Sequence, residues 1–306
     1  MFTLAHISDL HLGPLPKAES WSSYFSKRAI GYLSWRLRRQ KIHDPTVVAA
    51  LAEDINAHAP DHVALTGDLV NIALPGEFHN AAAWLKGFGN ADWVTLVPGN
   101  HDAYVGVGWE KGMGLWADYM TGEMRMPGAR HSVHNAAIFP FVRQRRNVAL
   151  IGTSTALPQS FRRAGGSLGQ QQLEALGQIL AELRQKGFYR ILLIHHPPLP
   201  GQAHDRKALS DSAHLKQVLE HEGVELVLHG HNHVHMRADL KTRHGTAHIV
   251  GVSSGSALAY KDKSPAAWHL YKIRRQDGEW LTEATVRSWN QNKQAFETEA
   301  EFVLTN

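Results

Sequence analysis

The residues of this sequence that could carry out chemistry are aspartates, histidines and an asparagine that follow short apolar runs. The clearest group is Gly99-Asn100-His101-Asp102, which comes after the apolar residues 93–97 and Pro98. Carboxylate, imidazole and amide groups are ligands that suit Mn, Fe or Zn, and histidine also transfers protons near neutral pH. The pattern therefore predicts a metal site. The candidates are Asp9, His11, Asp68, Asn100, His101, Asp102, His195, His196, His231 and His233.

Strands must position these side chains. The apolar runs that end in candidate residues are typical of buried strands, and they lie at residues 3–7, 62–66, 93–97, 189–194 and 224–228. Apolar residues at helical spacing predict helices over 45–57, 76–86 and 169–186. Strands that alternate with helices predict an α/β fold, in which sites form beyond the carboxyl ends of the strands. Asp9 and His11 are two residues apart, so in an extended chain both would project to one side.

The remaining strands predict a second sheet. Residues 139–142 and 148–152 are expected to form a hairpin in it, and residues 247–252, 268–273 and 280–289 are expected to complete it. Residues 103–135 are weakly periodic and predict a loop-rich excursion over the site. The lone histidines His6, His62, His229 and His248 are expected to be hydrogen-bonded core residues.

Composition limits the classes of function. The 306 residues are 43% hydrophobic and include no cysteine, which excludes disulfides, thiolate metal sites and a cysteine nucleophile. No run reaches the roughly 18 apolar residues of a membrane span, and the first residues lack the pattern of a signal peptide. We therefore expect a cytoplasmic protein with one domain over residues 1–290 and a polar tail without assigned structure over 291–306.

The segment from Trp21 to Ile42, within an insertion at about 14–44, combines aromatic and basic residues and has no acidic residue. It predicts a helical element with three alternative uses. It could contact anionic lipid headgroups, present cations to a phosphorylated substrate, or simply pack its aromatic side chains on the body of the protein. The net charge of +4 favours an anionic substrate. Nucleic-acid binding ranks lower because the basic residues are confined to one short element.

The candidate residues fall into blocks that resemble those of the calcineurin-like metallophosphoesterases. In order along the chain, the blocks are Asp9/His11, Gly67-Asp68, Gly99-Asn100-His101-Asp102, His195 and Gly230-His231-Asn232-His233. The resemblance implies a four-layer αββα sandwich of two mixed sheets flanked by helices. The form His195-His196-Pro197-Pro198 and the length are most similar to the bacterial branch of class III cyclic-nucleotide phosphodiesterases and glycerophosphodiesterases.

The resemblance also implies a binuclear metal centre. Its ligands would be Asp9, His11 and His233 for one ion, Asn100, His195 and His231 for the other, and Asp68 as the bridge. The cofactors would be two divalent ions, Mn, Fe or Zn, and a carboxylate bridge suits the short separation of two-metal hydrolysis. Such a pair activates water for in-line attack on phosphorus.

Other residues of the blocks would act around the metals. The resemblance implies that His101 protonates the leaving oxygen or stabilises the transition state, and that Asp102 orients the ring of His101. Of the adjacent pair, His195 is expected to be the ligand because it is nearest the strand, and His196 is expected behind it. Several phosphodiesterase relatives have a carboxylate three residues after the bridging aspartate, where this chain has Asn71.

We interpret the chain as a dimetal phosphoesterase that acts on phosphodiesters, cyclic nucleotides included. One alternative is a membrane-surface enzyme that hydrolyses a phosphate or pyrophosphate bond of a lipid-linked substrate. Another is a non-catalytic scaffold, which loss of ligands would reveal, but every ligand position is intact.

Overall fold

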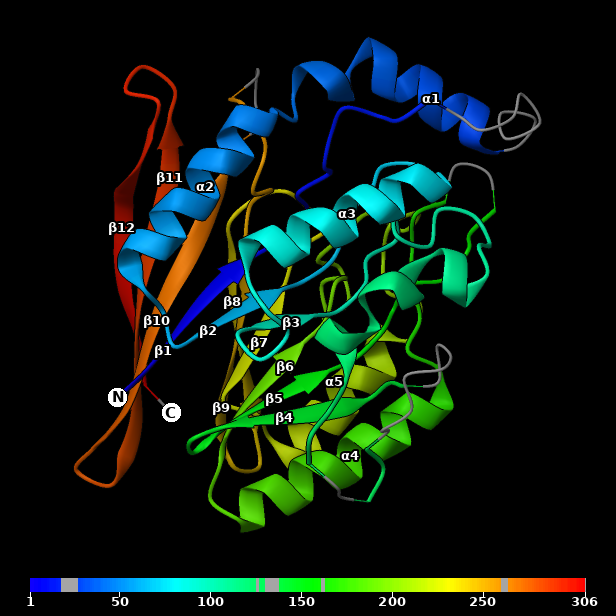
Figure 1. The fold of residues 1–306 in the computed structure, drawn as a ribbon. Helices are drawn as coiled ribbons and strands as arrows, with labels where there is room; N and C mark the ends of the chain where they lie inside the picture. The colour runs from blue at the N-terminus through cyan, green and yellow to red at the C-terminus, as the bar shows by residue number, and fades with distance from the viewer. Residues whose placement is uncertain (18–26, 125–126, 130–137, 161–162, 260–263, 306) are drawn as a thin grey trace.

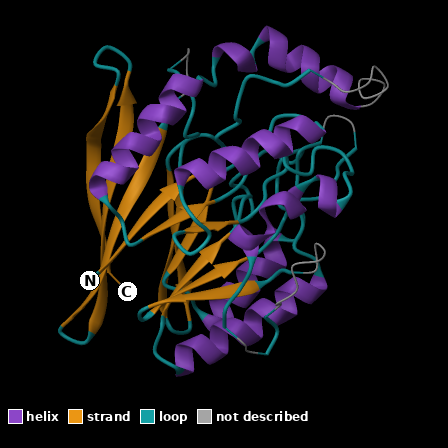
Figure 2. Cartoon of the chain, in the orientation of Figure 1, coloured by secondary structure: helices purple, strands orange, loops and turns teal. Residues whose placement is uncertain are grey.

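Two mixed β-sheets face each other and carry helices on their outer sides (Figures 1 and 2). The structure is a computed structural model that describes residues 1–17, 27–124, 127–129, 138–160, 163–259 and 264–305. Each sheet has six strands. The αββα sandwich that the resemblance implied is confirmed.

The first sheet is built around β1, the N-terminal strand. This strand pairs in parallel with β2, with Leu4 opposite His62, and antiparallel with β10, with Leu4 opposite Tyr271. The order across the sheet is β12 (Ala295–Thr305), β11 (Glu279–Asn290), β10 (Ala267–Gln276), β1 (Phe2–Ile7), β2 (His62–Leu65) and β3 (Val94–Leu96).

The second sheet has a parallel centre and antiparallel edges. Strands β5, β6, β7 and β9 run parallel, while β4 and β8 pair antiparallel at the two edges. The predicted hairpin of β4 and β5 is confirmed. The order across the sheet is β4 (Phe141–Arg145), β5 (Val148–Gly152), β6 (Tyr189–Leu193), β7 (Leu226–His229), β9 (Gly245–Gly251) and β8 (Met236–Thr242).

Alternate residues of the central strands serve two hydrophobic cores. Leu150 and Ile191 belong to the core between the sheets, whereas the neighbouring Ile151 and Leu192 pack beneath α4 and α5. Two-sided burial explains why these strands are continuously apolar. The helices are α2 (Pro45–His58) and α3 (Pro75–Phe88) over the first sheet, and α4 (Gln170–Gln185) and α5 (Ser212–Glu222) over the second.

Two predictions about the C-terminal part were wrong. The hairpin of residues 268–273 and 280–289 does form, but it joins the first sheet through β1 and not the second. Residues 291–306 are not an unassigned tail, because 295–305 form the edge strand β12. The apolar pattern of a strand is weak in this segment because only Phe296 and Leu304 are buried.

The basic segment is helical where the structure describes it, as expected. Helix α1 (Lys27–Leu37) is followed by the short 3-10 helix η2 (Arg39–Lys41), and residues 21–26 lie outside the described residues. Gly31 and Trp35 form the buried face of α1. Gly31 is required there because a Cβ would lie 2.6 Å from the Ile72 side chain. The described part of 103–135 holds only the 3-10 helices η3 (Trp109–Lys111) and η4 (Met113–Met120).

Candidate metal centre

The predicted ligands meet where five strands end. Asp9, Asp68 and Asn100 follow β1, β2 and β3 of the first sheet, and His195 and His231 follow β6 and β7 of the second. All these strands present their carboxyl ends to the same edge of the sandwich. Parallel pairing of neighbouring strands therefore brings residues from distant parts of the chain together.

One group of donor atoms comes from Asp9, His11, Asp68 and His233, and these atoms lie within 4.8 Å of one another. Nε2 of His233 is 3.1 Å from Oδ1 of Asp9 and 3.3 Å from Nε2 of His11. Nε2 of His11 is 3.9 Å from Oδ2 of Asp68. Two carboxylates and two imidazoles make a suitable set for a divalent transition metal.

A second group lies on the other side of Asp68. Nε2 of His195 is 3.4 Å from Oδ2 of Asp68 and 3.1 Å from Oδ1 of Asn100. Nδ1 of His231 is 2.8 Å from the same Asn100 oxygen and 3.3 Å from Nε2 of His195. Asp68 thus contributes to both groups, as a bridging ligand must.

The orientation of the imidazole rings fits a cation. Nδ1–H of His195 donates to the carbonyl oxygen of Thr66 at 2.6 Å, and Nδ1–H of His11 donates to that of Val70 at 3.3 Å. These bonds fix the tautomers and leave both Nε2 atoms as lone pairs that face the groups. Lone pairs at such separations repel unless a positive charge lies between them.

The backbone at the ligands is held in an unusual conformation. Asp9, His11, Asp68, His231 and His233 all have φ between 43° and 69°. Non-glycine residues rarely adopt this left-handed region, and such residues concentrate at functional sites. The expectation that Asp9 and His11 share a side through extended backbone was wrong, although both do reach the same group.

Glycines let the loops approach each other. A Cβ on Gly99 would lie 2.2 Å from Oδ1 of Asp68, and one on Gly230 would lie 1.9 Å from Oγ of Ser8. No side chain fits at these separations. The glycines of the Gly-Asn-His-Asp and Gly-His-x-His blocks are therefore steric requirements of the site.

Electrostatics favour positive charge at the groups. Burial alone would raise the pKa of Asp9, but the imidazoles of His233 and His195 and the hydroxyl of Ser8 together outweigh burial and hold that pKa well below its ordinary value. Burial would lower the pKa of His195, yet the carboxylates of Asp68 and Asp9 and the Thr66 carbonyl together overcome burial and raise that pKa to about 9. The carboxylates therefore hold a cation or a proton at this position.

His101 lies beside the metal ligands with one nitrogen occupied. Its Nδ1 contacts the carbonyl oxygen of Asn71 and lies 3.1 Å from Nη1 of Arg39. Burial and the Arg39 charge lower the pKa of His101 to about 3. An anionic phosphate bound beside the ring would raise this pKa, which is the direction that a proton donor requires.

The prediction that Asp102 orients the ring of His101 was wrong. Its two carboxylate oxygens accept backbone N–H bonds from Asp68 at 2.9 Å, Leu69 at 3.0 Å, Val70 at 3.2 Å and Gly99 at 2.8 Å. Asp102 therefore ties the Asp68 loop to the Asn100 loop. The ring of His101 is held instead by the Asn71 carbonyl, a backbone group that no side-chain pattern indicates.

His196 and Asn71 lie behind the ligands. Nδ1 of His196 bonds to Oγ1 of Thr155 at 2.7 Å, and Nε2 bonds to the carbonyl oxygen of Ala164 at 3.0 Å. Both nitrogens are occupied, so the choice of His195 as the ligand agrees with the geometry. The Asn71 side chain donates to the carbonyl oxygen of Leu12 at 3.0 Å.

The histidines expected in the core are hydrogen-bonded there. His6 bonds to Thr66 at 2.9 Å, His62 to Thr95 at 2.6 Å, His229 to the carbonyl oxygen of Gly230 at 3.1 Å and His248 to Asp239 at 2.8 Å. The candidate metal-ligand histidines differ from these because their ring nitrogens face other donor atoms across the sandwich.

The sequence did not single out His43. Its ring centroid is 4.5 Å from that of His11, and one of its nitrogens groups with donor atoms of His11 and His233. Nδ1 bonds to Oγ of Ser256 at 2.8 Å, which turns Nε2 toward the other histidines. The only signal in the sequence is its position at the end of the basic segment, directly before Asp44, the cap of α2.

Among the described residues, none of the helices has the length and apolar character needed to cross a membrane.

A model of the calcineurin-like phosphoesterase family matches residues 2–235. Over 285 residues the chain is 25% identical to a probable cyclic nucleotide phosphodiesterase from Synechococcus sp., covering 92% of this chain and 91% of that protein. A dimetal phosphatase from Danio rerio superposes with a TM-score of 0.64 at 14% identity, over 99% of this chain and 98% of its own.

A 5′-nucleotidase precursor from Thermus thermophilus gives a TM-score of 0.51 at 15% identity, over 99% of this chain and 54% of its own. At such low identity these two structures show a shared fold. The family match spans both groups of donor atoms and His101. The chain therefore belongs to the calcineurin-like phosphoesterase family and is a metal-dependent phosphoric ester hydrolase.

Proposed function

We propose that the protein hydrolyses phosphodiesters, and that it does so with two divalent ions, Mn, Fe or Zn. The observation that carries the proposal is the pair of donor groups that share Asp68. When bound, two such ions lower the pKa of a water molecule and neutralise charge on the phosphoryl oxygens. The Synechococcus relative, a probable cyclic nucleotide phosphodiesterase, supports a diester over a monoester.

The surrounding residues have separate tasks in this proposal. Asn100 and the histidines of the two donor groups bind the metal ions. His101 lines the cavity over the centre and delivers a proton to the leaving oxygen, with its ring held by the Asn71 carbonyl. Arg39 supplies a positive charge next to His101 and so helps to bind the phosphate.

The test compares bis(p-nitrophenyl) phosphate with p-nitrophenyl phosphate. Chelated protein is reloaded with manganese, and bound metal is counted before each assay. We expect a higher kcat/KM for the diester, and a loss of about 100-fold or more when Asn100→Ala removes a ligand. Lys241→Ala, an exposed substitution on β8, serves as the control.

A preference for the monoester would contradict the diester assignment. Hydrolysis of neither compound by protein that holds two ions would contradict it as well.

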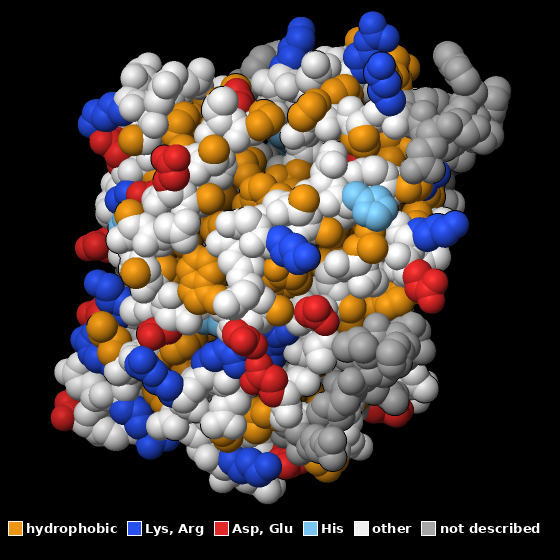
Figure 3. Space-filling model, in the orientation of Figure 1, with side chains coloured by type: hydrophobic (Ala, Val, Ile, Leu, Met, Phe, Trp, Pro, Cys, Tyr) orange, Lys and Arg blue, Asp and Glu red, His pale blue; other side chains and the backbone are white. Residues whose placement is uncertain are grey.

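A second candidate function is favoured by the outer face of α1. Leu33 and Leu37 lie on one side of this helix and are 55% and 62% exposed. In Figure 3, blue Lys and Arg side chains adjoin orange hydrophobic surface at the upper edge, where Figure 1 shows α1. Exposed apolar residues beside cations are typical of helices that lie on anionic membranes.

Some cations of α1 and η2 face the solvent, and others contact the body of the protein. Arg36, Arg38 and Lys41 are exposed, whereas Nη2 of Arg28 donates to the Ala73 carbonyl at 2.6 Å and Arg39 faces His101. The second candidate is thus an enzyme that acts at an anionic membrane surface on a lipid-linked phosphate or pyrophosphate.

Co-sedimentation with phosphatidylglycerol and phosphatidylcholine vesicles tests this candidate. We expect binding to the anionic vesicles only, and its loss in the variant L33S/L37S. Val303→Ser, which removes an apolar side chain 54% exposed on β12, should bind as the wild type does. Absence of wild-type binding to anionic vesicles would exclude the candidate.

A further inference from the structure

A cavity of about 380 Å³ opens beside the metal centre. It is bounded by α1 and η2 on one side, and on the other by Gln159, Arg163, Ala164, His204, Arg206 and Lys207. The cavity directly over the metal ligands shares Arg39, Asn100, His101 and Lys207 with it. A substrate bound at the metals can therefore extend into this space.

The lining of this cavity is strongly cationic. The basic residues are Lys27, Arg39, Arg163, Arg206 and Lys207. Among the described residues, none of those lining the cavity is acidic. Like charges gathered around one cavity repel one another, and an anionic ligand relieves that repulsion.

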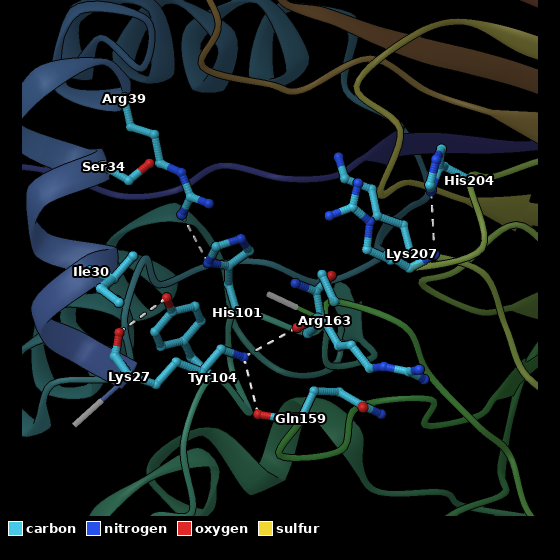
Figure 4. A pocket seen from close by; sticks show the side chains of 13 residues that line it. Lys27, Ile30, Ser34, Arg39, His101, Tyr104, Gln159, Arg163, His204 and Lys207 are labelled. Atoms are coloured by element: carbon cyan, nitrogen blue, oxygen red, sulfur yellow. Dashed lines mark hydrogen bonds between the residues drawn. The ribbon is translucent and has the colours of Figure 1, made fainter. Parts of the chain in front are cut away.

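Part of the lining is fixed in place. Nζ of Lys27 donates to the carbonyl oxygens of Gln159 at 3.3 Å and Arg163 at 3.2 Å, and lies 4.3 Å from the centre of the Tyr104 ring. Figure 4 shows His101 between Arg39 on one side and Lys207 on the other, with Arg163 below. Cations from distant segments thus line one cavity together with His101.

The position of His101 shows which part of the substrate this cavity receives. In the proposed function, on which this inference rests, His101 faces the leaving oxygen. Because His101 stands between the two cavities, the group beyond the leaving oxygen enters the cationic one. We infer that the leaving portion of the substrate carries its own phosphate, as in a molecule with two phosphates joined by an anhydride bond.

The reaction is the hydrolysis of the anhydride bond between the two phosphates. The oxygen of water loses a proton and forms a bond to the attacked phosphorus, and the bond from that phosphorus to the bridging oxygen breaks. The bridging oxygen keeps the electron pair of that bond and becomes part of the second phosphate. The products are two phosphate monoesters, of which one is left in the cationic cavity.

Two compounds with the same nucleosides provide the first test. Diadenosine 5′,5‴-P1,P2-diphosphate releases adenosine monophosphate, whereas adenylyl-(3′→5′)-adenosine releases uncharged adenosine. We expect a higher kcat/KM for the diphosphate. The ratio of the two values should fall about tenfold or more in R163Q/R206Q, mainly through KM, because charged hydrogen bonds to phosphate are lost.

The control is K241Q/R243Q, which removes the same charge from exposed positions on the far edge of the second sheet. It should leave the ratio unchanged. An equal ratio in the wild type and R163Q/R206Q would overturn the inference.

A binding measurement separates this inference from the proposed function. Calorimetry of adenosine monophosphate is done in excess chelator, so that the phosphate has no metal to bind. We expect binding that weakens about tenfold or more in R163Q/R206Q. If this loss occurs but no diester is hydrolysed, the cavity assignment stands and the proposed function fails. If bis(p-nitrophenyl) phosphate is hydrolysed but the variant binds adenosine monophosphate as tightly as the wild type, the cavity assignment fails.

Discussion

At the scale of single residues, the second ring nitrogen separates a metal ligand from a structural histidine. In His195 one nitrogen bonds to the Thr66 carbonyl and the other faces Asn100 and Asp68. In the adjacent His196 both nitrogens are taken by Thr155 and Ala164. Of these two adjacent histidines, His195 is therefore placed as a metal ligand and His196 as a structural residue.

Replacing these two histidines in turn should give different results. His195→Ala removes a ligand, so we expect affinity for one metal ion to fall by about 100-fold or more. His196→Ala should keep its metal content and lose only stability, about 1–3 kcal/mol for the buried groups left without partners. Elemental analysis after gel filtration and thermal melting measure the two effects. Loss of metal from the His196 variant would contradict the assignment.

The residues that the structure brings together could be selected from the sequence because they lie in short polar blocks just after apolar runs. His43 and the position of Arg39 could not, because they depend on how α1 and η2 fold back over the site. The partner of Asp102 was mispredicted for a similar reason. A buried carboxylate bonds to whichever N–H groups the loops present, and the sequence does not show which loops lie beside it.

At the scale of elements, the loop before α3 holds His101 through a buried acid. The Glu77 carboxylate accepts backbone N–H bonds from Asn71 at 2.6 Å, Ile72 at 3.1 Å and Leu74 at 2.9 Å. Asn71 in turn presents its carbonyl to His101. The first turn of a helix thus determines the shape of a loop in the active site.

We expect Glu77→Ala to destabilise the protein by roughly 3 kcal/mol or more, because buried N–H groups lose their acceptor. It should also reduce kcat, since His101 loses its support. Glu77→Gln keeps an acceptor oxygen and should lose less of both. Urea unfolding and steady-state kinetics measure these effects, and full stability in Glu77→Ala would refute the role of this acid.

Helices and strands that follow from the local hydrophobic pattern could be predicted. The sheet to which a strand belongs was harder to predict, because it depends on pairing between distant segments. The buried stripe of α4, with Leu176, Ile179 and Leu183, was visible in the sequence. The hairpin of β10 and β11 was visible too, but its sheet was not, because pairing with β1 links residues far apart in the chain. Strand β12 is mostly exposed and lacked a hydrophobic pattern.

At the scale of the whole molecule, the candidate metal centre draws its residues from both sheets. Asp9, Asp68 and Asn100 extend from the first sheet, and His195 and His231 extend from the second. Ions bound between them would hold the sheets together at this edge. Metal binding should therefore stabilise the entire sandwich and not one loop.

We expect removal of metal by a chelator to lower the midpoint of thermal unfolding by about 5 °C or more. The estimate follows from the stabilisation of about 2.7 kcal/mol that a ligand gives at 100 times its Kd. Manganese added back should restore the midpoint. In Asn100→Ala the change should be smaller, and an equal change in that variant would show that the metal acts elsewhere.

The place of β1 between β2 and β10 has a consequence for synthesis on the ribosome. Residues 1–65 can pair β1 with β2 early, but the other edge of β1 stays open until residues 267–276 emerge. An open strand edge is a template for aggregation. Nascent chains that already contain every candidate ligand thus still expose the unpaired edge of β1. A pause in translation before β10 would therefore favour aggregation more than a pause after it.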